Sequence, residues 1–223
     1  MKSLISDLHK AFSLLEDKNS AAKMKNYLKG QFAFYGVKAA DRKQITKEFL
    51  KIHPLNDIDQ LKEFVKLAWE QDQREFQLLA IDILIKYKKN LQLEDASFVL
   101  SLIKSKSWWD TVDMIASHLI GQILLQNRTK FTLTIKAWVK DDNMWVRRTA
   151  IISQLKHKAE LDTTLLNYAL TNNFGSKEFF INKAIGWILR EHSKLDPNWV
   201  VTFIDNNKKS LSNLSIREGS KYL

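Results

Sequence analysis

Five side chains with complementary chemistry recur at regular spacing in the second half of the chain. Asp113, Arg148 and Lys183 lie 35 residues apart. Trp109 stands four residues before Asp113, and Trp187 stands four residues after Lys183. Residues four apart lie on one face of a helix, so each tryptophan is expected to share a face with its charged neighbour. The spacing predicts a strip that holds one acid, two cations and two aromatic rings.

The acid is the unexpected member of this strip. Arg148 and Lys183 suit phosphate groups, and exposed tryptophans can stack on bases or cover sugars. A carboxylate repels nucleic acid, so Asp113 is better explained by a reaction whose transition state is cationic. Cleavage of an N-glycosidic bond produces an oxocarbenium-like sugar, as in glycosidases. At about 4 Å and an effective dielectric constant of about 20, the attraction is near 4 kcal/mol, which is on the order of a thousandfold in rate.

Each member of the strip also has an ordinary structural explanation. A tryptophan on a helix usually belongs to the core, which is the expectation for Trp69, Trp138, Trp145 and Trp199. A lone charged residue on a helix usually faces solvent. A core would not repeat charges at one position of successive helices, and this agreement in register favours a functional strip.

The elements that must position these residues read as helices almost throughout. Apolar residues recur at helical spacing, and no stretch alternates as a strand would. Short polar breaks at residues 53–57, 140–143 and 172–176 separate segments of helical length. The pattern predicts an all-α protein.

Four of these helices follow one another in register. Equivalent segments begin at Arg74, Trp109, Met144 and Phe179, with expected N-caps at Asp72, Ser107, Asp142 and, one residue early, Ser176. A period of about 35 residues with two helices in each unit is typical of an α-solenoid. One helix of each pair lines the concave face of a solenoid. We therefore expect residues 1–223 to form a single repeat domain with the strip on its concave face.

Composition excludes several classes of protein. Six glycines and two prolines argue against a fold of many strands, and no GxGxxG, P-loop or GxSxG motif is present. Cysteine is absent, and the five histidines form no ligand pair, so we expect neither a metal nor a cofactor. No apolar run approaches the roughly 20 residues that cross a bilayer, and the N-terminal segment reads as an amphipathic helix. The expectation is a soluble, cytoplasmic protein without membrane contacts.

The net charge favours a polyanionic partner. Lys and Arg number 35 against 25 Asp and Glu, which gives +10 at neutral pH. Such a balance suits nucleic acid, although a lysine-rich solvated surface would give the same count. Beside the strip, the basic residues suited to phosphate are Arg147, Lys156 and Arg190.

Four strings in the chain resemble those of the AlkD-type DNA alkylation repair glycosylases. These strings are KSWWDTVD at residues 106–113, KEFFINKAIGW at 177–187, REFQ at 74–77 and LSIRE at 214–218. The resemblance covers residues 24–223. It implies a superhelix of HEAT-like repeats that excises N3-methyladenine and N7-methylguanine, both cationic, from double-stranded DNA.

The resemblance also implies roles for particular residues. Trp109 and Trp187 would contact the deoxyribose of the lesion, and Asp113 would stabilise the sugar cation and orient water. Arg148 would hold the DNA backbone, and Tyr27 would lie near the DNA. No enclosed base pocket would be required.

The chain departs from the family pattern at two places. It has Ala-Ala-Asp-Arg-Lys at residues 39–43, where the family often has Thr-Pro before Arg-Arg, and Gly219 where alanine is common. The first change lies in a loop expected to approach DNA, so it bears on the contacts expected of Lys38 and Lys43. Neither change touches the two tryptophans or Asp113.

The expected activity is that of a monomeric, monofunctional DNA glycosylase that leaves an abasic site. Two alternatives stay open on the sequence. One is a binder of damaged or structured DNA without catalysis, and the other is a HEAT-type protein–protein scaffold whose basic groove faces an acidic peptide.

Overall fold

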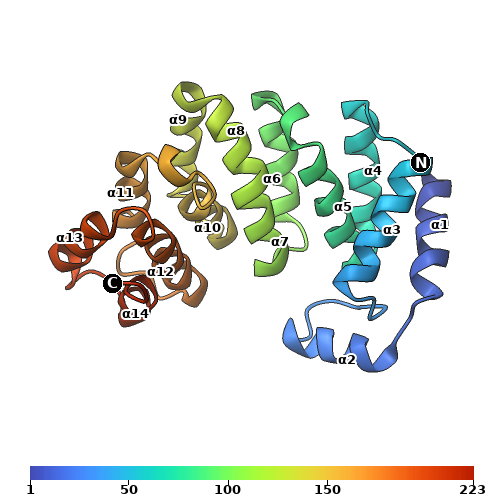
Figure 1. Cartoon of the computed structure of the whole chain (residues 1–223), viewed down its shortest axis with the longest axis horizontal. Coiled ribbons are helices and arrows are strands. Elements are labelled where there is room, and N and C mark those ends of the chain that lie inside the picture. The colour runs from blue at the N-terminus through green and yellow to red at the C-terminus, as the bar shows by residue number, and fades with distance from the viewer. The chain divides into compact units, whose positions relative to one another are not determined.

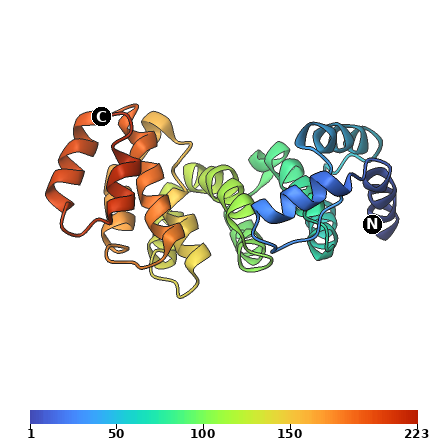
Figure 2. The ribbon, with the colours of Figure 1, turned by 90° about the horizontal axis from the view of Figure 1, so that it is seen from below.

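The computed structural model describes all 223 residues, and its regular structure is helical throughout (Figures 1 and 2). The only β-type pairing is an isolated bridge between Ala33 and Gln73. The predicted all-α class is therefore confirmed. The chain divides into two compact units, Met1–Asn90 and Leu91–Leu223.

The first unit packs its helices around a core of aromatic and aliphatic side chains. Its helices are α1 (Lys2–Ser13), α2 (Lys18–Tyr27), α3 (Ala39–Ile52), α4 (Ile58–Glu70) and α5 (Arg74–Lys86), followed by a 3-10 turn at Lys88–Asn90. Phe12, Phe64 and Phe76 are fully buried. The rings of Phe12 and Phe76 meet edge to face with their centroids 5.1 Å apart, which joins α1 to α5.

A buried carboxylate on α5 fixes the segment that leads into α3. Oε1 of Glu75 accepts hydrogen bonds from the backbone amides of Gly36, at 2.8 Å, and Val37, at 3.2 Å. Burial raises the pKa of Glu75, and the donated amide hydrogen bonds oppose that rise. Lys38 follows directly as the N-cap of α3, so this contact sets where the helix begins.

Replacing Gly36 with alanine is expected to destabilise the first unit by about 3 kcal/mol or more. Gly36 has φ of +90°, and a Cβ there would lie 2.1 Å from the carbonyl oxygen of Asp17. A left-handed backbone costs an ordinary residue about 1–2 kcal/mol, and the overlap with backbone adds to that. Urea unfolding followed by circular dichroism measures the loss.

The matched control for this variant is Gly30→Ala. Gly30 also has positive φ, at +76°, but a Cβ there would meet nothing within 4 Å. Only the backbone strain of about 1–2 kcal/mol is expected. If the two variants lost the same free energy of unfolding, this would contradict a close approach of Gly36 to Asp17.

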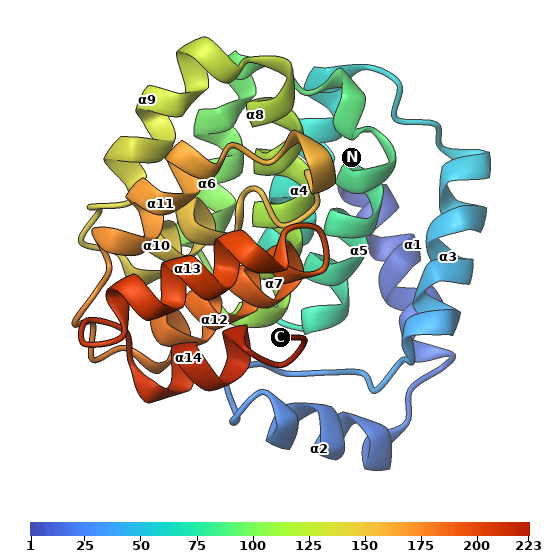
Figure 3. The ribbon, with the colours of Figure 1, turned by 60° about the vertical axis from the view of Figure 1, so that its left-hand side comes forward.

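The second unit contains the remaining helices. These are α6 (Ala96–Lys104), α7 (Trp109–Met114), α8 (Gly121–Gln126), α9 (Arg128–Trp138), α10 (Met144–Ile152), α11 (Thr163–Thr171), α12 (Phe179–Ser193), α13 (Pro197–Asn207) and α14 (Asn213–Gly219), with 3-10 turns at Leu93–Asp95 and Lys158–Glu160. Figure 3 shows α12 beside α13 and α14, and α12 contacts both.

The helix starts confirm the 35-residue register of the α-solenoid. α5, α7, α10 and α12 begin at Arg74, Trp109, Met144 and Phe179, as predicted. The predicted caps are wrong by one or two residues, because the N-cap residues are Gln73, Trp108, Asn143 and Glu178. Among these four, only the Asn143 side chain accepts a helix amide, that of Trp145. The helix register therefore comes from packing rather than from side-chain caps.

One helix of the second unit contains a wider turn. α7 continues through a π-helical turn, Ile115–Ile120, directly into α8. This turn begins two residues after Asp113, and the Ser117 hydroxyl donates to the Asp113 carbonyl oxygen at 2.7 Å. Turns of this kind often accompany functional sites.

A glycine lets α14 approach α12 closely. A Cβ at Gly186 would lie 2.5 Å from Cβ of Glu218 and 2.9 Å from the carbonyl oxygen of Ser215. The Ser215 hydroxyl also donates to the carbonyl oxygen of Asn182 at 2.9 Å. This contact brings the buried side chain of Glu218 against α12.

The sequence also predicts that residues 1–223 act as one domain with a single concave face. This stays a prediction.

Candidate functional site

The predicted strip comes together in one cavity of the second unit. The cavity has a volume of about 320 Å³ and is lined by Trp109, Asp113, Arg148, Phe179, Phe180, Lys183, Trp187 and Arg190. All five residues of the strip are among them, contributed by α7, α10 and α12. Because these helices begin in the same register, their fifth residues (Asp113, Arg148 and Lys183) come to the same cavity.

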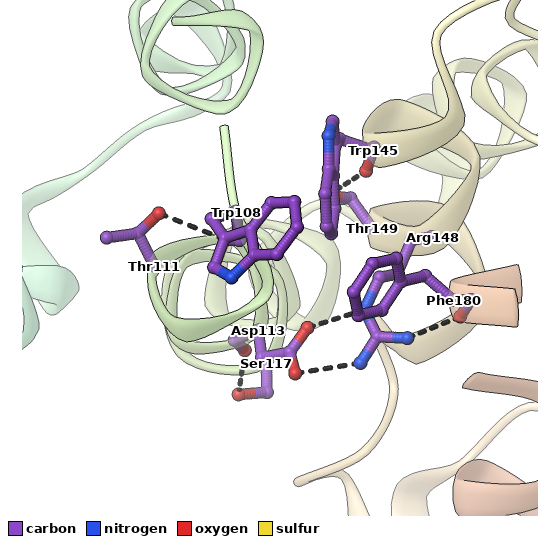
Figure 4. A network of polar contacts seen from close by, with 8 residues as sticks. All are labelled: Trp108, Thr111, Asp113, Ser117, Trp145, Arg148, Thr149 and Phe180. Atoms are coloured by element: carbon purple, nitrogen blue, oxygen red, sulfur yellow. Dashed lines mark hydrogen bonds and ion pairs between the residues drawn. The ribbon is translucent and has the colours of Figure 1, made fainter. Parts of the chain in front are cut away.

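Asp113 and Arg148 form a two-point ion pair in this cavity (Figure 4). Nε of Arg148 donates to Oδ1 of Asp113 at 2.7 Å, and Nη2 donates to Oδ2 at 2.8 Å. The third guanidinium nitrogen, Nη1, donates to the carbonyl oxygen of Phe180. The side chains of Arg148 and Asp113 are only 4% and 13% exposed. Parallel hydrogen bonds of this kind fix the orientation of the carboxylate.

Burial and the ion pair act on Asp113 in opposite directions. Burial raises the pKa of Asp113, and the hydrogen bonds and charge of Arg148 lower it. The carboxylate is thus held in a place where water stabilises it poorly. A positive charge that developed in the cavity would be attracted more strongly here than at an exposed aspartate.

A cluster of aromatic rings packs beside the ion pair, and the guanidinium carbon of Arg148 lies 5.8 Å from the centroid of the Phe180 ring. The ring centroids of Trp108, Trp145 and Phe180 lie 5.0–5.7 Å from one another. They come from the starts of α7, α10 and α12, so the cluster joins the three helices that carry the strip. Phe179, by contrast, lines the cavity and is 59% exposed.

The predicted core tryptophans divide into two kinds. Trp69 and Trp138 are buried, as predicted. Trp145 and Trp199 are only half-buried, so the prediction that they belong to the core holds for them only in part.

Several of the candidate phosphate-binding residues form hydrogen bonds or ion pairs within the protein. Arg148 is tied to Asp113, and Nη1 of Arg147 donates to the carbonyl oxygens of Asp141 and Asp142. Lys156 is exposed. The phosphate contacts expected of these residues stay predictions, and the burial of Arg148 adds a role that the sequence did not indicate.

Two further candidates share one carboxylate. Lys183 and Arg190 both form ion pairs with Glu218 of α14, at 3.0 and 2.8 Å. Glu218 is buried, and its own pKa is lowered to about 2, chiefly by the hydrogen bond from Lys183. Glu218 stands in the string LSIRE but is not among the site residues that the sequence predicts.

The remaining candidates lie in the first unit. Tyr27, at the end of α2, is 70% exposed. Lys38 and Lys43, at the start of α3, are also exposed. Their side chains are accessible, and their expected contacts with DNA stay predictions.

The chain holds no group of three or more residues that could bind a metal. No helix is long and apolar enough to span a membrane. Two more residues of this site are not predicted from the sequence. The carbonyl oxygen of Phe180 accepts a hydrogen bond from Arg148, and the ring of Trp108 packs against the ring of Phe180.

Comparison with known proteins gives consistent matches. Residues 8–223 match the model of a family described as DNA alkylation repair enzyme. A solved structure described as a predicted DNA alkylation repair enzyme from Enterococcus faecalis is 34% identical, with a TM-score of 0.86 over 93% of this chain and 96% of that chain.

Two structures from Streptococcus mutans share the fold at 18% identity. One is AlkD2, with a TM-score of 0.63 over 92% of this chain and 98% of that chain. The other is smu.31, with a TM-score of 0.62 over 82% of this chain and 97% of that chain. A comparison with curated protein sequences found no match to the chain.

Proposed function

Since the chain belongs to the DNA alkylation repair enzyme family, we propose that it is a monofunctional glycosylase for cationic alkylated purines in double-stranded DNA. This membership confirms the resemblance predicted from the sequence. The proposed substrates are N3-methyladenine and N7-methylguanine, and the proposed enzyme is a cytoplasmic monomer. The observation that supports catalysis is the Asp113 carboxylate, held by Arg148 in a cavity lined by Trp109 and Trp187.

The reaction proposed for this cavity is hydrolysis through a cationic sugar. The bond between C1′ and the base nitrogen breaks, and its electron pair neutralises the positive charge of the alkylated base. The deoxyribose then carries the charge, which the Asp113 carboxylate stabilises while Trp109 and Trp187 enclose the sugar. Water adds to C1′ and loses a proton, which leaves an abasic site and the free neutral base.

A cationic base makes a general acid unnecessary. The base leaves as a neutral molecule, so nothing needs to protonate it before the bond breaks. This agrees with a cavity in which the one acid, Asp113, is paired with an arginine. Lesions with neutral bases lack this activation and are expected to react far more slowly.

Binding to DNA is proposed to depend on the basic residues around the cavity. The net charge of +10 favours a polyanion. Each phosphate that the protein neutralises steepens the fall of affinity with salt by about one unit of logarithmic slope. A steep fall would favour both DNA-binding interpretations over a protein–protein scaffold.

The test of the proposed function is single-turnover release of 7-methylguanine from a methylated duplex. With protein in excess, free base is expected to accumulate while the strand stays uncut until alkali cleaves the abasic site. The same duplex without methylation is the control and should release nothing. Duplex binding without release of 7-methylguanine or 3-methyladenine would contradict the proposal and favour a binder of damaged DNA.

A further inference from the structure

The carboxylate of Glu218, near the C-terminal end of the chain, forms ion pairs with three cationic side chains. Oε1 of Glu218 pairs with Nζ of Lys183 at 3.0 Å. Oε2 pairs with Nη1 of Arg190 at 2.8 Å and with Nζ of Lys221 at 3.0 Å. The Glu218 side chain is 6% exposed, whereas those of its partners are 20–48% exposed. The anion of this cluster is therefore internal and the cations lie toward the surface.

Two of the three cations belong to the cavity that holds Asp113. Lys183 and Arg190 line it, and Lys221 does not. They lie seven residues apart on α12, which places them two turns apart on the same face. The close approach of α14 at Gly186 places Cβ of Glu218 against α12. From there its carboxylate reaches both cations of the cavity.

The charges of this cluster bear on both binding and chemistry. With one anion and three cations the cluster carries a net charge of +2, which favours phosphate. Bare cations beside the cavity, however, would repel a cationic base and a cationic sugar. A buried carboxylate directly behind them reduces that repulsion and prevents the two side chains from swinging freely toward phosphates.

We propose that Glu218 is a positioning residue, which holds Lys183 and Arg190 at the cavity wall and offsets their charge where the cationic intermediate forms. The second half of this proposal rests on the proposed glycosylase function, and the first half does not. The lowered pKa of Glu218, about 2, means that it is ionised wherever the protein is studied near neutral pH.

The test is the variant Glu218→Gln, which keeps the size of the side chain and removes its charge. Lys183 and Arg190 become free to reach phosphates, so the salt dependence of duplex binding should steepen by about one to two units of slope. Release of 7-methylguanine at saturating protein should slow on the order of tenfold, because a negative charge that offsets Lys183 and Arg190 near the cationic intermediate is lost. Stronger salt dependence together with slower release is a combination that general loss of structure does not produce.

Two further variants act as controls. Glu191→Gln removes the charge of another α12 carboxylate, which pairs with Lys194 and does not line the cavity, so the rate of base release should stay at its wild-type value. Glu218→Asp keeps the charge but draws the carboxylate back by one methylene group, so its salt slope should lie between those of the wild type and Glu218→Gln. If the glutamine variant fails to fold, a wild-type slope in Glu218→Asp would contradict the positioning role.

The outcomes separate this proposal from the proposed function. An unchanged or shallower salt slope in the folded Glu218→Gln variant would overturn the positioning role, whatever the rate does. A steeper slope with an unchanged rate would overturn the effect on the intermediate. If the wild type releases no base, the fault lies with the glycosylase proposal, and the slope still tests the position of the two cations.

Discussion

Asp113→Asn is expected to slow base release by about two to three orders of magnitude while leaving the duplex bound as tightly as before, or more tightly. The carboxylate supplies about 4 kcal/mol of attraction to a sugar cation at about 4 Å, and most of this is lost with the charge. Binding should hold or improve, because a negative charge is removed from a cavity that we propose lies against the DNA. Single-turnover rates and equilibrium binding of a methylated duplex measure the two effects separately.

The control for the loss of a carboxylate is Asp205→Asn. Asp205 is exposed on α13 and does not line the cavity. Its variant should release base at the wild-type rate. Unchanged release by Asp113→Asn would remove Asp113 from the chemistry and, with it, the mechanism proposed above.

The second large effect is expected from Arg148→Met, which takes away the partner of Asp113. A buried carboxylate left without its cation destabilises a protein by about 3–5 kcal/mol. With Arg148 gone, the pKa of Asp113 should rise further, since burial already raises it and the opposing charge is lost. Base release should therefore be weak at neutral pH and recover toward alkaline pH, where the carboxylate ionises.

The pH dependence of stability follows from the same raised pKa. An acid whose pKa is higher in the folded protein binds protons more tightly there, so the folded state is favoured at low pH. As pH rises above the ordinary pKa of aspartate, the Arg148→Met variant should lose stability until the pH passes the raised pKa. Urea unfolding at several pH values measures this loss.

The double variant Asp113→Asn/Arg148→Met provides the control for this explanation. Removing both charges leaves no buried ion, so much of the lost stability should return. A phosphate contact, in contrast, would show as a salt slope shallower by about one, with little change in stability. A stable Arg148→Met variant with the wild-type pH profile would mean that Arg148 does not hold Asp113.

The sequence was sufficient for the architecture because the fold repeats. A period of 35 residues is visible in one chain, and the helix starts follow it at Trp109, Met144 and Phe179. The same period brought Asp113, Arg148 and Lys183 to one cavity, as predicted from their equal spacing. Repetition converts a spacing along the chain into a position in space.

What the sequence did not reveal depends on packing between helices. Nothing in the spacing distinguishes an arginine that faces DNA from one that is buried, and Arg148 is buried against Asp113. The Phe180 carbonyl oxygen and the Glu218 carboxylate act across contacts between helices, where no local pattern marks them. The caps were misplaced for a related reason, since tertiary contacts rather than side-chain hydrogen bonds fix where these helices begin.

The π-helical turn at Ile115–Ile120 allows the side chains before it and after it to face different directions, although they belong to one continuous helix. An α-helix advances about 100° per residue, so one extra residue in a turn would rotate everything beyond it by that angle. The wider turn absorbs this rotation. Asp113 can therefore point into the cavity while Ile123 and Leu124, on the far side of the turn, remain buried in the core. Deletion of one residue within the turn would rotate α8 relative to α7 by about 100°. Asp113 could then no longer face the cavity while Ile123 and Leu124 stay buried.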